Sequence, residues 1–198
     1  MTTAGTELRH GGFSNPVSDS QQVFRAALDA LARPGNIEII TVETEAPAGL
    51  APATAALLLT LLDFETPVWL QSPNPEIEAF LRFHCSCPLT RDPAAARFAL
   101  LTDPVQAPAI DVFEQGSAEY PDRSATLILQ VEHLGTDGGM RLSGPGIADV
   151  CQLHAALLPA DFRQQLTANH QRFPRGVDFF LCSGSRLAAL PRTTVTES

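Results

Sequence analysis

The stretch PVWLQSPNPEIEAFLRF, residues 67–83, places a strand directly in front of a helix. Residues 67–71 are mostly apolar and favour a short strand. Asn74 is a preferred N-cap residue and Pro75 a preferred first helical residue, so the sequence predicts a helix over residues 75–83. A strand followed at once by a helix is the repeating unit of α/β folds, and this stretch therefore indicates the fold class.

The same alternation continues on both sides of this stretch. A capping box of Ser18 and Gln21 predicts a first helix, which the Arg-Pro-Gly sequence at 33–35 ends. Thr-Asp-Gly-Gly at 136–139 predicts a hairpin turn between a strand before it and a strand at 140–143. Further strands are expected at 37–42, 97–101, 126–133, 177–182 and 186–190, and further helices at 53–62 and 159–171. We therefore expect a three-layer α/β/α sandwich with a mixed sheet.

The 198 residues, 44% hydrophobic and 18% charged, are enough for one domain with a sizeable core. We expect a single α/β domain over residues 16–194, a flexible N-terminal segment at 1–15 and a C-terminal tail at 195–198. The N-terminal segment lacks the apolar stretch of a secretion signal, and four cysteines make a poor disulfide framework. These features predict a cytoplasmic protein with reduced thiols.

The charge pattern excludes several classes of partner and chemistry. The net charge is -9, and the 13 basic residues are arginines scattered along the chain, so the clustered basic face that nucleic acid or an anionic membrane requires is not indicated. The longest apolar run, residues 55–62, is far shorter than the ~20 residues that cross a bilayer. Without a lysine the chain cannot run Schiff-base pyridoxal-phosphate chemistry or Walker-type P-loop catalysis, and we expect no cofactor.

His84, Cys85 and Cys87 form the densest cluster of side chains that could bind a metal, and Cys151 and His154 could complete a set. Imidazole and thiolate are zinc ligands, but paired zinc cysteines usually have two to four residues between them. One intervening residue does not provide that geometry, so we expect small buried thiols and no metal. An autonomous small enzyme or metal-binding protein centred on this cluster remains the alternative function.

Gly144 and Gly146 could bring backbone amides close to a phosphate group. The dinucleotide-binding fingerprint requires a third glycine where this chain has Asp149, so a tight turn is the favoured interpretation. The chain also lacks the Gly-x-Ser-x-Gly elbow of α/β-hydrolases, and a serine hydrolase is therefore not indicated.

Two charged residues near predicted strand ends need partners. Asp178 begins an apolar run, and we expect it to form a structural ion pair with Arg172 or Arg175. Arg192 follows the last predicted strand beside two threonines, where it could contact an oxyanion or a phosphate. A solvated tail is the alternative interpretation of that segment.

Seven ordered blocks carry a resemblance to a known family: VFR (23–25) with ARPG (32–35), LLTLLD (58–63) with TPVWL (66–70), RFH (82–84), ATLILQV (125–131), LSGPGI (142–147), FPRGVD (173–178) and PRTT (191–194). Together they closely resemble the PhnH family of carbon-phosphorus lyase subunits over about residues 16–194. The resemblance implies a fold like the large domain of pyridoxal-phosphate transferases without the cofactor, which agrees with the missing lysine. Cys85 and Cys87 depart from the family pattern.

The resemblance also implies a function. Members of this family act with sister subunits G, I and J, and the first step joins methylphosphonate to the ribose of ATP to give α-D-ribose 1-methylphosphonate 5-triphosphate. The chain is then expected to be a homodimer and an obligatory structural or substrate-binding subunit, not a catalyst by itself. The residues expected to border one pocket or partner-facing surface, which could hold ATP or a phosphonate, are Arg82, His84, Gly144, Gly146, Asp178 and Arg192.

Overall fold

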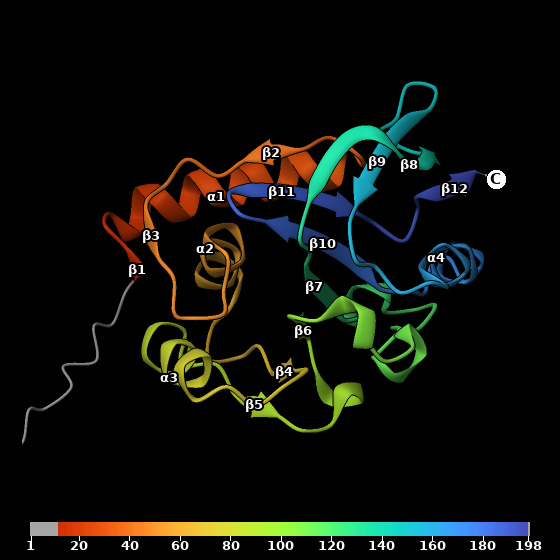
Figure 1. The fold of residues 1–198 in the computed structure, drawn as a ribbon. Helices are drawn as coiled ribbons and strands as arrows, with labels where there is room; N and C mark the ends of the chain where they lie inside the picture. Colours follow the sequence, from red (N-terminus) through yellow and green to blue (C-terminus); the bar gives the residue numbers. More distant parts are fainter. Residues whose placement is uncertain (1–11, 198) are drawn as a thin grey trace, which may run out of the picture.

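A seven-stranded mixed sheet forms the centre of the computed structural model, which describes residues 12–197 (Figure 1). Its strands, in spatial order, are β2 (Glu38–Ile39), β11 (Arg186–Leu190), β10 (Asp178–Ser183), β7 (Thr126–Gln130), β6 (Phe98–Leu101), β4 (Val68–Leu70) and β5 (Leu89–Thr90). Neighbours from β10 to β5 are parallel, whereas β11 is antiparallel to both β10 and β2. The predicted α/β class and mixed sheet are confirmed.

The central strands are apolar on both faces, because both faces of the sheet are covered. In β10, Phe180 and Cys182 belong to the core on one face, whereas Phe179 and Leu181 belong to the core on the other. Alternation of side chains along a strand produces this division. The sheet therefore separates two hydrophobic cores.

Three helices cover one face: α1 (Pro16–Ala32), α2 (Pro52–Leu61) and α3 (Pro75–His84). Six consecutive residues of α2, from Ala53 to Leu58, are buried, as its uniformly apolar sequence predicts. In α3, Asn74 is the N-cap, and its side chain accepts hydrogen bonds from the amides of Glu76 and Ile77. The strand and helix predicted from residues 67–83 are thus confirmed.

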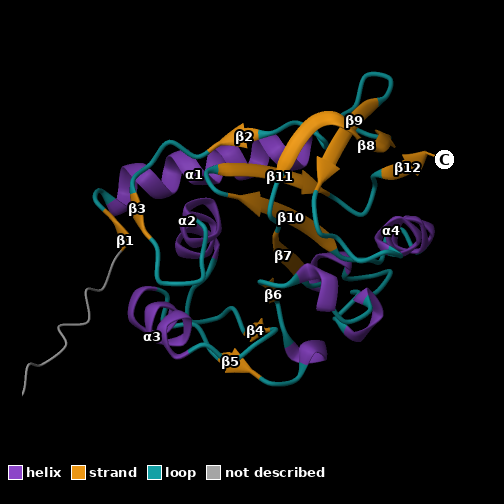
Figure 2. Cartoon of the chain, in the orientation of Figure 1, coloured by secondary structure: helices purple, strands orange, loops and turns teal. Residues whose placement is uncertain are grey.

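The opposite face carries a second sheet as well as a helix (Figure 2). This sheet has the order β12-β8-β9, and α4 (Phe162–Gln171) packs beside it. Its strands are β8 (Leu134–Ser143), β9 (Cys151–Ala155) and β12 (Val195–Glu197). The third layer is therefore part sheet and part helix, where the sequence indicated helices alone.

The remaining elements are short. Strand β1 (Gly12–Phe13) pairs with β3 (Thr44–Glu45). Four 3-10 helices connect the parallel strands: η1 (Pro93–Ala95), η2 (Pro104–Gln106), η3 (Ile110–Val112) and η4 (Pro121–Arg123). Within residues 12–197, none of the helices has the length and apolarity that crossing a bilayer requires.

The predicted hairpin between residues 126–133 and 140–143 is wrong. β7 is a central strand of the main sheet, and β8 pairs with β9 and β12 instead. The register of β8 against β9 shifts between Gly135 and Met140, so the Thr-Asp-Gly-Gly sequence forms an irregularity inside one strand. A two-residue glycine signal cannot distinguish such a bulge from a turn.

The ends of two other elements also differ from expectation. The N-cap of α1 is Asn15, whose side chain accepts from the amide of Ser18, so the helix begins one turn before the predicted capping box. Residues 195–197, expected to be a tail, pair with β8 as β12. Of the predicted N-terminal segment, residues 1–11 lie outside the described part of the chain, and residues 12 and 13 form β1.

Candidate functional site

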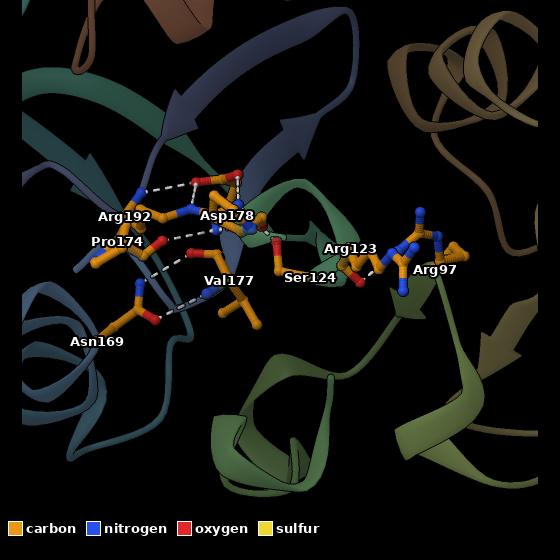
Figure 3. A network of polar contacts seen from close by, with 9 residues as sticks. Arg97, Arg123, Ser124, Asn169, Pro174, Val177, Asp178 and Arg192 are labelled. Atoms are coloured by element: carbon orange, nitrogen blue, oxygen red, sulfur yellow. Dashed lines mark hydrogen bonds and ion pairs between the residues drawn. The ribbon is translucent and has the colours of Figure 1, made fainter. Parts of the chain in front are cut away.

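A partly buried ion pair joins Asp178 and Arg192 where β10 begins and β11 has just ended (Figure 3). The carboxylate is held at both oxygens: Nη2 of Arg192 lies 2.5 Å from Oδ2 and Nε lies 3.1 Å from Oδ1. The backbone amide of Arg192 also donates to Oδ1, at 2.8 Å. The Arg192 side chain is 13% exposed and the Asp178 side chain 23%, so water and salt screen the attraction between the two charges only weakly.

Arg192 also binds the loop that leads into β7. Its Nη1 donates to the carbonyls of Pro121 at 2.8 Å and Pro174 at 3.3 Å, and Nη2 donates to Oγ of Ser124 at 2.6 Å. A guanidinium has five N–H groups. The three contacts to this loop and to Pro174, together with the two side-chain contacts to Asp178, account for all five. Arg192 therefore has no donor left for a ligand, and its position gives it a structural role.

The structure corrects the predicted partners of Asp178. Arg172, one of the two expected partners, instead donates to Oε1 of Gln115 at 3.2 Å, and the carboxylate pairs with Arg192. Strand pairing explains why Asp178 pairs with Arg192. Phe179 lies opposite Leu190 in the β10–β11 ladder, so the chain just beyond this pair brings Asp178 and Arg192 together.

Asn169 in α4 is a second buried anchor, which the sequence analysis missed. Its side chain accepts from the amide of Val177 at 2.9 Å and donates to the carbonyl of the same residue at 2.8 Å. Only 1% of Asn169 is exposed, and it lies on the face of α4 that also buries Phe162 and Leu166. The sequence did carry a signal for this contact: a polar residue on an otherwise apolar helix face is buried and needs a hydrogen-bond partner.

Gly144 and Gly146 allow two chain segments to approach the loop after β8. A Cβ at Gly144 would lie 2.9 Å from the carbonyl oxygen of Thr193, next to Arg192 in the chain. A Cβ at Gly146 would lie 2.1 Å from the carbonyl oxygen of Ala32, at the end of α1. Protein backbone thus occupies the space beside both glycines, and the loop is a tight packing turn with Ile147 donating to the carbonyl of Gly144.

Arg82 and His84 lie apart from this region, in the last turns of α3. Arg82 forms an ion pair with Glu78 at 3.2 Å and lines a cavity of about 500 Å³ at the carboxyl ends of β4 and β5, with Arg91 on the same cavity. The His84 ring packs against the rings of Phe80 and Phe83, at centroid distances of 4.8 and 4.9 Å. The structure thus brings Asp178, Arg192 and Gly144 together and places Arg82 and His84 in a different element.

The two cysteines after His84 are buried in the core beneath α2 and α3. Burial raises the pKa of the Cys85 thiol to about 12 and also raises the pKa of Cys87, since a thiolate loses its hydration there. Among residues 12–197, no three His, Cys, Asp or Glu side chains gather closely enough to hold a metal ion. The cluster therefore lacks both a reactive thiolate and a complete ligand set within those residues.

Comparison with known proteins gives full-length similarity. A family model described as bacterial phosphonate metabolism protein (PhnH) matches residues 11–197. The chain is 38% identical over 199 residues to the α-D-ribose 1-methylphosphonate 5-triphosphate synthase subunit PhnH of Rhizobium meliloti, an alignment that covers 98% of both chains. It is also 38% identical over 79 residues, 40% of each chain, to the putative C-P lyase subunit protein HtxG of Stutzerimonas stutzeri.

Proposed function

The chain belongs to the PhnH family of bacterial phosphonate metabolism proteins, and from this premise we propose that it is a subunit of the carbon-phosphorus lyase core complex. In that role it works with sister subunits G, I and J in making α-D-ribose 1-methylphosphonate 5-triphosphate from ATP and methylphosphonate. The alignment with the Rhizobium meliloti subunit supports this function, because it covers 98% of both chains and so extends over the whole domain.

The chain contributes structure or substrate binding to this reaction and does not catalyse it alone. The observation that carries this part of the proposal is the use of Arg192: all five of its N–H groups have acceptors within the chain. The guanidinium of Arg192 is therefore unavailable as a catalyst. The alternative, an autonomous enzyme or metal protein centred on His84, Cys85 and Cys87, has no support from relatives and faces buried thiols with a raised pKa.

Membership of this family also bears on the oligomeric state of the chain and on the fold to which it is related. We infer a cytoplasmic homodimer that joins the sister subunits, as the family resemblance implies. Five neighbouring parallel strands followed by antiparallel β11 are compatible with the large domain of pyridoxal-phosphate transferases. Since the chain has no lysine, that fold cannot attach the cofactor through a Schiff base.

Adenine release from ATP and methylphosphonate tests the function directly. We expect none from the purified chain alone, and release when subunits G, I and J are added, because the chain lacks a self-sufficient catalytic group. Chromatographic detection of adenine provides the readout, and sedimentation of the isolated chain should give the mass of two copies. Adenine release that follows the isolated chain through repurification, or full activity of the other subunits without it, would contradict the proposal.

A further inference from the structure

A second arginine cluster lies beside the Arg192 network, at the amino ends of β6 and β7. Arg97 immediately precedes β6, and Arg123 ends η4, three residues before β7 begins at Thr126. Both arginines line one cavity of about 360 Å³, together with Tyr120, Ser117 and Glu114 (Figure 3 shows the two arginines). The family blocks and the predicted site did not include either arginine.

The two guanidinium groups keep most of their donors for this cavity. The Arg97 side chain donates one N–H to the backbone carbonyl of Arg123, and within residues 12–197 this is the one hydrogen bond of its guanidinium. Arg123 lies over the ring of Tyr120, 4.2 Å from the centroid, and has no ion pair or side-chain hydrogen bond to another described residue. Glu114 is the one carboxylate on the lining, and one of its oxygens already accepts from the amide of Gly116 at 3.0 Å.

The loop that presents these groups is held firmly. Arg192 binds the carbonyl of Pro121 and the hydroxyl of Ser124, which flank Arg123. Ser117 accepts from the amide of Tyr120 at 3.0 Å, and Ala125 donates to the carbonyl of Glu114 at 2.8 Å. Such support fixes a binding group before the ligand arrives, which reduces the entropy lost on binding.

We propose that the cavity of Arg97, Tyr120 and Arg123 binds a tetrahedral oxyanion of the phosphate and phosphonate class. Guanidinium groups match the geometry of such oxygens and form charge-assisted hydrogen bonds with them. The hydroxyls of Ser117 and Tyr120 on the same lining add neutral donors. The cavity beside α3 that Arg82 and Arg91 line is less suited, because Arg82 already pairs with Glu78.

This inference deepens the proposed function and rests on it for the choice of probe. Calorimetric titration of the purified chain with methylphosphonate is the test, and inorganic phosphate and ATP are the two further ligands. We expect binding that weakens with added salt, since it is electrostatic. Arg123→Gln should weaken it by about tenfold or more, because a charge-assisted contact is lost.

Matched variants separate this cavity from general charge effects. Arg25→Gln removes the same charge from an exposed position on α1 and should leave binding unchanged. Arg123 is itself exposed, so Arg123→Gln should keep the wild-type melting temperature, and Arg97→Gln provides an independent loss of affinity. The ligand that binds most tightly identifies the source of the oxyanion: free phosphonate, free phosphate or a nucleotide.

The proposal is overturned if none of the three ligands binds at up to about 10 mM. It is also overturned if binding survives Arg123→Gln and is lost in Arg91→Gln, which would move the site to the cavity beside α3. Failure of the oxyanion site differs from failure of the proposed function: a chain that binds no oxyanion but restores adenine release with the sister subunits refutes this inference alone.

Discussion

At the scale of single residues, Arg192 shows how a charged side chain in a family block can serve the fold. Its carboxylate partner, two backbone carbonyls and a serine hydroxyl come from two chain segments, residues 121–124 and 174–178, which meet where β7 and β10 begin. The guanidinium therefore replaces water for groups that folding removes from solvent. Loss of this side chain would leave the partly buried Asp178 carboxylate with the backbone amide of residue 192 as its donor, and it would remove a donor from two backbone carbonyls and a serine hydroxyl.

Arg192→Ala is expected to lower the free energy of unfolding by about 3 kcal/mol, because it breaks a partly buried pair and leaves the charge of Asp178 without a cation. Chemical unfolding of the purified protein measures the change. Arg141→Ala is the control, since Arg141 pairs with Glu197 at 3.2 Å while 52% exposed, and exposed pairs contribute at most about 1 kcal/mol. Equal losses in the two variants would refute the structural role of Arg192.

The sequence named both members of this pair but did not pair them. Asp178 and Arg192 stood out because each follows or begins a strand, a local property. Their contact depends on the register between β10 and β11, which no local pattern specifies. Arg97 and Arg123 were missed because they lie 26 residues apart in the chain and only the fold brings them to one cavity. Asn169 was missed although its position on an apolar helix face was a local signal.

At the scale of elements, local signals predicted helices and central strands well. α2 and α3 begin within one residue of prediction, because proline and asparagine at a helix start act through neighbouring backbone groups. Strand pairing was predicted poorly: β8 and β9 form the antiparallel pair that the sequence assigned to residues 126–133 and 140–143. Local glycine patterns define where a strand bends and not which strand lies beside it.

A glycine inside β8 and a glycine in the loop after it provide a test at this scale. Gly138 and Gly146 both have a positive φ, +80° and +85°, but a Cβ at Gly138 would meet nothing within 4 Å, whereas one at Gly146 would clash with Ala32. Gly138→Ala should therefore cost about 1 kcal/mol of unfolding free energy from backbone strain alone. Gly146→Ala should cost about 3 kcal/mol or more, because strain and overlap add.

Unfolding of the two glycine variants side by side distinguishes these contributions. A loss in Gly146→Ala no larger than that in Gly138→Ala would mean that the loop can move away from α1. In that case the tight approach of the two segments would not contribute to stability.

At the scale of the whole molecule, two hydrophobic cores lie on opposite faces of the main sheet. The core beneath α1, α2 and α3 includes the thiols of Cys85, Cys87 and Cys182, and burial raises the pKa of Cys182 to about 12. Thiols of this kind stay protonated at neutral pH and pack as small apolar groups.

We therefore predict that chelation leaves the protein unchanged. Dialysis against EDTA should not alter the melting temperature, because loss of a metal bound to the native state would lower it. The double variant Cys85→Ser, Cys87→Ser should lose stability equally with and without added zinc, through burial of hydroxyl groups. About one zinc per chain in elemental analysis, with EDTA-dependent melting, would restore the metal-binding alternative.

Both edges of the main sheet end in very short strands, β2 and β5, each of two residues. An edge strand offers unpaired amides and carbonyls to any chain that can align with it, and a two-residue edge offers very few. Strand addition at the main sheet therefore provides little binding energy, and the same feature protects the folded subunit against edge-to-edge aggregation. Stable contacts with other subunits should instead use the outer helices and loops or the second sheet, whose edge strand β9 has five residues.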